Sequence, residues 1–214
     1  MTDYRKSGLA LIAGSLGGLI TMMLHPTARD LMVPGEFDAV VRLNVAVHSL
    51  ALISVPVLFL GALGLTRYLG SPSRLSLAAL VIYGYGCMAV MNAGAFSGFI
   101  APGVLRQIAA ASGGSQDAWR VALHYTGNLN QAFARMFVVA SSVSVLLWSL
   151  DWMRFGRLGS ALGMYGCLVG IVVPLALLTD HVRLNVHGFG AIVVVQSIWL
   201  ITAGTFLCRV PEAR

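Results

Sequence analysis

Residues 45–65, VAVHSLALISVPVLFLGALGL, decide the fold because they contain no Asp, Glu, Lys or Arg. An α-helix needs about 20 mostly apolar residues to cross the hydrocarbon core of a bilayer. Working outward from this stretch, five more long and mostly apolar stretches are found, at residues 7–24, 75–100, 131–150, 158–178 and 188–207. The sequence therefore predicts an all-α polytopic membrane protein, a six-transmembrane-helix bundle that forms a single integral membrane domain over residues 1–214.

The composition excludes a soluble domain and a nucleic-acid-binding protein. Hydrophobic residues make up 57% of the chain and charged residues only 10%, whereas soluble domains contain about 25% charged residues. The formal net charge of +6 therefore reflects membrane topology rather than affinity for nucleic acid, and the expected partner is the lipid bilayer. The three cysteines all lie within apolar stretches, where no disulfide framework is expected: Cys87, Cys167 and Cys208.

The basic residues that flank the spans predict the orientation. The larger group, assigned to the cytoplasmic side, comprises Arg5, Lys6, Arg67, Arg74, Arg154, Arg157, Arg209 and Arg214. The smaller, outer group comprises Arg29, Arg42, Arg106, Arg120 and Arg183. By the positive-inside rule, both termini face the cytoplasm of a multi-pass protein in the cell (inner) membrane. The first apolar stretch is interpreted as an uncleaved span, because no A-x-A-like cleavage site follows it.

Short sequence matches indicate three helical hairpins in parallel repetition. Arg-Leu-Asn-Val occurs at 42–45 and 183–186, Leu-Asn occurs at 129–130, and Tyr-Gly-Cys occurs at 85–87 and 165–167. Matches this short also arise by chance in an apolar chain, so both interpretations stay open. Small-xxx-small pairs such as Gly14 and Gly18 or Gly166 and Gly170 predict close helix packing. Between the third and fourth spans, 112–114 predicts a turn and Ser115 a helix N-cap.

The five histidines carry the functional hypothesis, because all of them fall on the predicted outer side. His48 and His187 are the strongest ligand candidates. Further candidates are His25, His181 and His124, with Asp180 as a ligand or as an orienting group. A neutral imidazole binds zinc, copper, iron or haem iron, and hairpin ends bring distant residues together. The sequence therefore predicts a metal ion (Zn, Cu or Fe) or a haem at this rim. The alternative for each histidine is an ordinary interfacial or solvated side chain.

A polar stripe on the fourth span predicts a cavity next to the histidines. Its members are His124, Asn128, Gln131 and Arg135, whose spacing places them on one helix face. Asn44 adds to this polar group because it lies one turn before His48 on the same face. Arg135 either binds an anion or headgroup inside the bundle, with Asp180 as the nearest counter-ion, or extends along the lipid toward the surface.

These features lead to one functional expectation and two alternatives. The leading hypothesis is a membrane protein with an outward-facing histidine-rich site that binds a metal ion or haem, as in a membrane oxidoreductase or metalloenzyme. No H-E-x-x-H, G-x-S-x-G or Walker motif is present, so whether the protein is an enzyme stays open. The alternatives are a small-solute transporter and an accessory or structural subunit, acting as a homo-oligomer or within a larger membrane complex.

Overall fold

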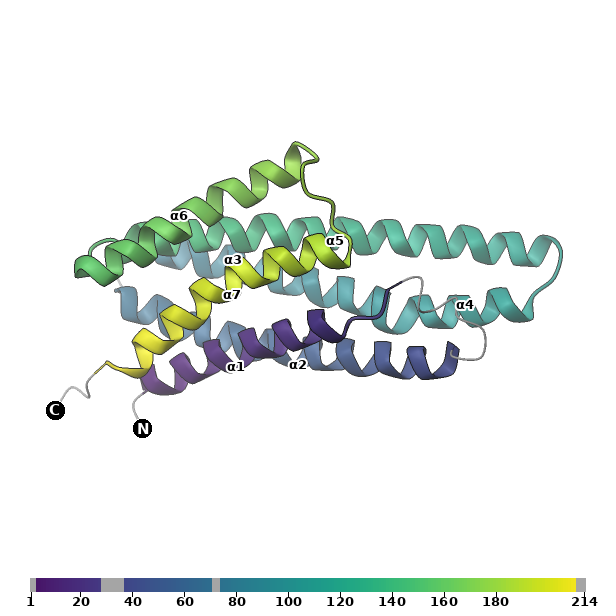
Figure 1. Ribbon diagram of the computed structural model, residues 1–214, viewed down its shortest axis with the longest axis horizontal. Coiled ribbons are helices and arrows are strands. Elements are labelled where there is room, and N and C mark those ends of the chain that lie inside the picture. The colour runs from purple at the N-terminus through teal and green to yellow at the C-terminus, as the bar shows by residue number, and fades with distance from the viewer. Residues whose placement is uncertain (1–2, 28–36, 71–73, 211–214) are drawn as a thin grey trace.

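The chain folds into an all-α bundle with six passes long and apolar enough to cross a membrane, as predicted. The computed structural model describes residues 3–27, 37–70 and 74–210, and in this part of the chain every regular element is helical (Figure 1). These elements are α1 (Asp3–Leu24), α2 (Phe37–Leu69), α3 (Arg74–Ala95), η2 (Phe96–Ile100), α4 (Ala101–Ala110), α5 (Gly114–Trp152), α6 (Gly156–Leu178) and α7 (Val186–Cys208). Arg29 and Arg214, which were assigned to opposite sides of the membrane, lie outside the described residues.

The two ends of the bundle differ, and we name them for what they hold. The terminal end contains the start of α1 and the end of α7, next to both chain termini, and the arm end is the opposite end (Figure 1). Helix α1 packs against α2 and α7, while α5 packs against α3 and α6. Helix α6 contacts α7 far less than it contacts α5, and Figure 1 shows it leaning away from the bundle toward the arm end.

The passes are unequal in length. Helices α1, α6 and α7 have 22, 23 and 23 residues, whereas α5 has 39. At 1.5 Å per residue, α5 is about 58 Å long, nearly twice the hydrocarbon thickness of about 30 Å. Helix α2 has 33 residues and the third pass, Arg74–Ala110, has 37. The long helices therefore extend beyond the short ones, and we call α4 with residues 114–129 of α5 the arm.

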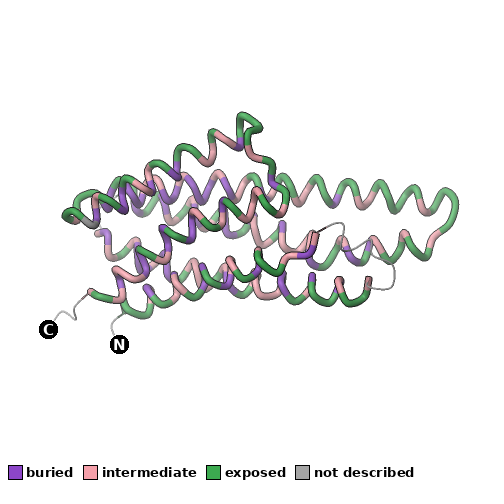
Figure 2. The backbone as a smooth tube through the Cα atoms, viewed as in Figure 1, coloured by how far each residue is buried: buried purple, intermediate pink, exposed green. Residues whose placement is uncertain are grey.

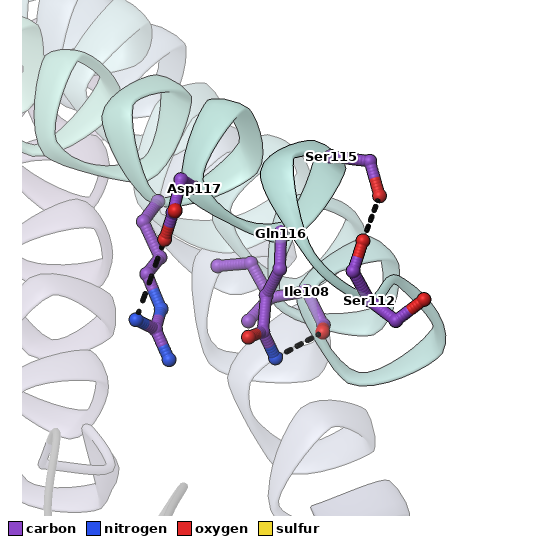
Figure 3. A network of polar contacts seen from close by, with 6 residues as sticks. Ile108, Ser112, Ser115, Gln116 and Asp117 are labelled. Carbon is purple, nitrogen blue, oxygen red and sulfur yellow. Dashed lines mark hydrogen bonds and ion pairs between the residues drawn. The ribbon is translucent and has the colours of Figure 1, made fainter.

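Polar contacts near its tip hold the arm together (Figure 3). Gln116 Nε2 donates to the Ile108 carbonyl across the two helices at 3.3 Å, and Arg106 pairs with Asp38 of α2 at 3.0 Å. The turn at 112–114 forms as predicted, with Gly113 at φ +57°. The predicted N-cap is wrong: Gly113 is the cap, and the Ser115 hydroxyl donates to the Ser112 carbonyl at 2.7 Å instead. A hydroxyl that donates to a carbonyl behind it does not satisfy the free N–H groups of the helix.

Glycines allow α1 and α2 to approach each other closely. A Cβ added at Gly14 would lie 2.6 Å from Leu58 Cγ, and one at Gly61 would lie 2.7 Å from the Leu11 backbone nitrogen. The α6 glycines serve the same role against α5, since a Cβ at Gly170 would lie 2.8 Å from the Ser142 carbonyl oxygen. Close backbone approach of this kind supports helix association in a bilayer. It also fixes the relative height of residues on α1 and α2.

The main core fills the terminal half of the bundle. Trp148, Trp152 and Trp199 are fully buried there, with ring centroids 6.0–6.2 Å apart in the Trp148–Trp199 and Trp152–Trp199 pairs. Beside them lies Asp151, which is 1% exposed. This carboxylate accepts a 2.5 Å hydrogen bond from Ser76 Oγ and pairs with Arg154. A buried charge is tolerated when it is paired and hydrogen-bonded, so Asp151 joins the start of α3 to the end of α5.

The outer surface of the bundle contacts lipid. Large apolar side chains on α2, α3 and α6 are exposed, among them Ile53, Val81 and Leu168, each more than 60% accessible. A water-soluble protein does not expose an apolar surface of this extent, but such a surface matches the bilayer interior. Buried positions concentrate in the bundle, whereas most residues of the arm are exposed (Figure 2).

Candidate functional site

Two of the five histidines form a direct pair at the arm end. Nε2 of His25 lies 3.3 Å from Nε2 of His48, and the ring centroids are 4.8 Å apart at an interplanar angle of 69°. His25 follows the last residue of α1, and His48 lies inside α2. Thr21 Oγ1, one turn before His25, lies 2.9 Å from Gly17 O of its own helix and 3.3 Å from Val47 O of α2, so its hydroxyl is shared between the two carbonyls. Because Val47 precedes His48, this contact between the helices brings the two rings to the same height.

The other ring nitrogen of each histidine is held by a backbone carbonyl. His48 Nδ1 lies 2.8 Å from Asn44 O, and His25 Nδ1 lies 2.8 Å from Pro26 O. A carbonyl can only accept, so each Nδ1 must carry a hydrogen and donate it. A neutral imidazole has one N–H, and therefore both Nε2 atoms have lone pairs and no hydrogen. In neutral rings, two lone pairs then lie 3.3 Å apart, and a proton or a metal ion shared by the two nitrogens would join them.

An irregular turn of the third pass holds the backbone beside His48. In η2, a single π-helical turn, the Ala101 N–H bonds to Phe96 O, one residue further back than in an α-helix. Pro102 has no N–H, so the Ser97 carbonyl loses the donor that the next turn would supply. Asn44 Nδ2 replaces it, donating to Ser97 O at 3.0 Å and to Gly98 O at 3.3 Å. Asn44 is 3% exposed and therefore ties α2 to η2 at the height of the histidine pair.

Glycine at position 98 allows η2 to lie directly against His48. A Cβ at Gly98 would lie 2.4 Å from His48 Cβ and 2.6 Å from His48 Cγ. At Gly94, one turn earlier, the nearest His48 atom would be 3.9 Å away, which is ordinary van der Waals contact. His48, which is 4% exposed, is thus confined by η2 on one side and by His25 on the other.

The histidine pair opens into a cavity of about 770 Å³, which we call the histidine cavity. It lies where α1 and α7 stop and the longer helices continue into the arm. Its polar lining brings together many of the predicted residues, namely His25, His48 and His187 with Asn44 and Gln131. Its apolar lining includes Ala51, Val90, Ala93, Ala134 and Phe189. A cavity of this size with a few convergent polar groups is typical of a small-molecule site.

Other predicted site residues lie away from this cavity. His124 and Asn128 are exposed on the arm. His181 is exposed in the link between α6 and α7, where Nδ1 contacts Thr179 Oγ1 at 2.9 Å, and Asp180 occupies the adjacent turn at φ +55°. Arg135 is exposed on α5 over an almost wholly apolar hollow that Ile82, Tyr85 and Val139 also line. Arg135 and Asp180 form no ion pair with each other.

The cavity also contains polar residues that were not assigned to it from the sequence, namely Asn130, Asn185 and Ser97. A signal for two of them was present. The Leu-Asn pairs at 43–44, 129–130 and 184–185 form the proposed repeat, and all three of their asparagines line the histidine cavity. Ser97 lies in the π-helical turn, and no pattern in the sequence indicates that turn.

Within residues 3–27, 37–70 and 74–210, no group of three or more His, Cys, Asp or Glu side chains is positioned to hold a metal ion. The histidine pair therefore supplies two ligand atoms, and any further ligands would come from water or from a bound molecule. Comparison with protein-family models, with curated proteins and with solved structures gave no match. Function is inferred below from the geometry of the cavity.

Proposed function

We propose that this membrane protein binds a transition-metal ion between His25 and His48, at the bottom of a cavity that faces the outside of the cell. The observation that carries the proposal is the pair of Nε2 atoms 3.3 Å apart, on two rings whose Nδ1 atoms each contact a backbone carbonyl at 2.8 Å. A carbonyl that accepts from the second ring nitrogen is the usual support for a metal-binding histidine, because it fixes the tautomer and the ring orientation.

The spacing favours a metal ion over haem. Two nitrogens bound tetrahedrally to one ion at about 2.05 Å are about 3.3 Å apart, which matches the pair. Two axial ligands of a haem lie on opposite faces of the ring, about 4 Å apart, with the macrocycle between them. The 3.3 Å separation leaves no room for a porphyrin. A proton shared by the two rings is the competing occupant, because an N–H of one ring can hydrogen-bond to the Nε2 of the other at the same 3.3 Å.

A metal ion with two protein ligands keeps open positions that face the cavity. Such an ion can polarise a bound molecule or lower the pKa of bound water. The chain itself would fix the two imidazoles, bury His48 and shape the space next to the ion. This arrangement suits a binding site for a small molecule, and turnover of that molecule would make the protein a metalloenzyme or oxidoreductase.

The transporter alternative requires a path across the membrane. Below the histidine cavity, the core is filled by large side chains that are at most 2% exposed, among them Leu11, Leu65, Tyr83 and Trp148. The cavity is therefore closed toward the terminal end in this conformation. This favours a binding site that is open on one side over a transport path across the membrane.

The outward orientation follows from charge. Seven of the basic residues assigned to the cytoplasmic side flank the terminal end: Arg5, Lys6, Arg67, Arg74, Arg154, Arg157 and Arg209. By the positive-inside rule, this end faces the cytoplasm. The histidine cavity and the arm then face the outside of a cell (inner) membrane.

The test measures metal binding directly. The protein is purified in detergent, stripped with a chelator, loaded with Zn²⁺ or Co²⁺, and its metal content and affinity are measured by mass spectrometry and calorimetry. We expect one ion per chain and a loss of affinity greater than about 100-fold in His25→Ala and His48→Ala, because removing mere supporting groups already costs about 10–100-fold.

The matched controls are His124→Ala and His181→Ala, which should bind the ion like the wild type. Wild-type protein that retains no ion would favour the shared proton and refute the proposal. Retention of the ion by a His25→Ala, His48→Ala double variant would refute the choice of ligands.

A further inference from the structure

The wall of the histidine cavity that α5 and the start of α7 supply is made of neutral hydrogen-bonding side chains. We call it the amide wall, and its members are Asn130, Gln131, Asn185 and His187. The first two lie on α5, Asn185 caps α7, and His187 lies in the first turn of α7. The amide wall belongs to different helices from the histidine pair, and both open into the same cavity.

Two hydrogen bonds fix part of the amide wall and leave the rest available. Gln131 Nε2 donates to Leu184 O at 3.0 Å, which ties α5 to the link before α7. Asn185 Oδ1 accepts from Gly188 N at 2.9 Å. Gln131 Oε1 and Asn185 Nδ2 stay free, and the Asn130 and His187 side chains form no hydrogen bond with any described residue. The wall therefore offers both donors and acceptors from anchored positions.

The charge of the lining selects the chemistry of a ligand. None of the described residues that line the histidine cavity is Asp, Glu, Lys or Arg. A charged group at the amide wall, away from the metal ion, finds no side-chain counter-charge there, and it keeps part of its hydration because Gln131, Asn185 and His187 are exposed. A neutral amide, carbonyl or hydroxyl group, in contrast, replaces its hydrogen bonds to water with bonds to the amide wall.

From this arrangement we infer that the histidine cavity binds a small molecule at two points. One end donates a nitrogen or oxygen lone pair to the metal ion at His25 and His48, and the uncharged, hydrogen-bonding other end contacts the amide wall. This inference rests on the proposed metal site. The cavity volume of about 770 Å³ lies within the range of about 300–1,000 Å³ for small-molecule sites.

Three probes that share a pyridine ring test the inference. Pyridine, nicotinamide and nicotinate each offer a ring nitrogen to a metal, and they differ only in carrying no side group, a neutral amide or a carboxylate. Each is titrated into the Co²⁺-loaded protein, and binding is followed by the visible cobalt spectrum. We expect nicotinamide to bind about threefold to tenfold more tightly than pyridine, as one or two hydrogen bonds would give, and nicotinate to gain nothing.

Matched variants separate the amide wall from the metal. Asn130→Leu should remove the advantage of nicotinamide and leave the affinities for Co²⁺ and pyridine unchanged. Asn128→Leu is the control, because Asn128 is an exposed residue of the same type on the same helix outside the cavity. The affinity of each probe is compared between variants, so the different basicities of the three probes do not affect the comparison. Gln131→Leu provides a second variant if Asn130→Leu does not fold.

The outcomes distinguish this inference from the metal site. If Co²⁺ binds but nicotinamide shows no advantage that depends on Asn130, the two-point ligand is wrong and the metal site stands. Tighter binding of nicotinate would also overturn it, in favour of an anion site. If Co²⁺ does not bind at all, the metal site fails and the two-point ligand fails with it.

Discussion

At the scale of single residues, hydrogen bonds and packing separate the paired histidines from the others. His25 and His48 have one ring nitrogen held by a backbone carbonyl and the other directed at its partner. His124, His181 and His187, the last of which was predicted to be a ligand with His48, are exposed and lie outside this pair. All five histidines share a predicted position near one face of the membrane. That position is therefore a weaker indication of metal binding than a ring nitrogen held by a backbone carbonyl.

The substitution Gly98→Ala tests the support of His48 without removing either ligand residue. A methyl group at Gly98 would clash with His48 Cβ and Cγ, whereas one at Gly94 would not. We expect Gly98→Ala to lower the metal affinity by about 10–100-fold, as is usual when a supporting contact is lost. Gly94→Ala should bind like the wild type in the same calorimetric titration. Equal affinities for the two variants would show that His48 does not depend on this contact.

At the scale of elements, the π-helical turn η2 is stabilised from outside its own helix. Asn44 donates to two of its carbonyls because Pro102 cannot. The turn therefore depends on α2, and α2 carries His48. A short irregular segment thus couples the third pass to the histidine pair, and π-helical turns are often found at functional sites.

Replacing both partners tests this coupling. Asn44→Leu leaves the Ser97 carbonyl, to which Pro102 cannot donate, without its side-chain donor and should lower the free energy of unfolding by about 1–3 kcal/mol. Adding Pro102→Ala restores an N–H that can bond to Ser97 O, so the double variant should recover part of that loss. The measurement is thermal unfolding in detergent.

The control is Asn92→Leu, because Asn92 Nδ2 donates only to Met88 O within its own helix and the side chain is exposed. If Pro102→Ala changes the free energy of unfolding equally in the Asn44→Leu variant and in the wild type, the two residues do not act through the same carbonyls.

How much the sequence could predict depends on the range of the interactions. The six passes follow from runs of apolar residues, and Asn44 and His48 share a face because they are four residues apart on one helix. The contact between His25 and His48 depends on the height at which α1 packs on α2, which local spacing does not contain. Asp151 was not singled out, because nothing near it in the sequence indicates that Ser76 would lie beside its carboxylate.

At the scale of the whole molecule, the unequal helix lengths set the position of the membrane. The short passes α1, α6 and α7 match the hydrocarbon thickness, and the polar part of α5 continues past them with α4. We therefore expect the arm to lie in water, with the histidine cavity at its base. The remaining question is which side of the membrane the arm end and the terminal end each occupy.

Cysteine labelling tests this topology. In a variant whose three native cysteines are replaced by alanine, Ser115→Cys lies on the arm, Arg209→Cys at the terminal end, and Leu168→Cys on the lipid-facing side of α6. A membrane-impermeant maleimide applied to intact cells should label position 115 only, and position 209 should react after permeabilisation. Position 168 should resist labelling in both cases. The reverse pattern at 115 and 209 would place the cavity on the cytoplasmic side.

The uneven distribution of tryptophan gives the protein a built-in optical reporter. Trp148, Trp152 and Trp199 are sealed in the terminal half, while Trp119 lies on the arm and is 37% exposed. Dissolved iodide should therefore quench the fluorescence of Trp119 and leave the fluorescence of the three buried tryptophans unchanged. The fraction of emission that iodide removes reports on the arm alone, and the blue-shifted remainder reports on the integrity of the core, without any dye attached.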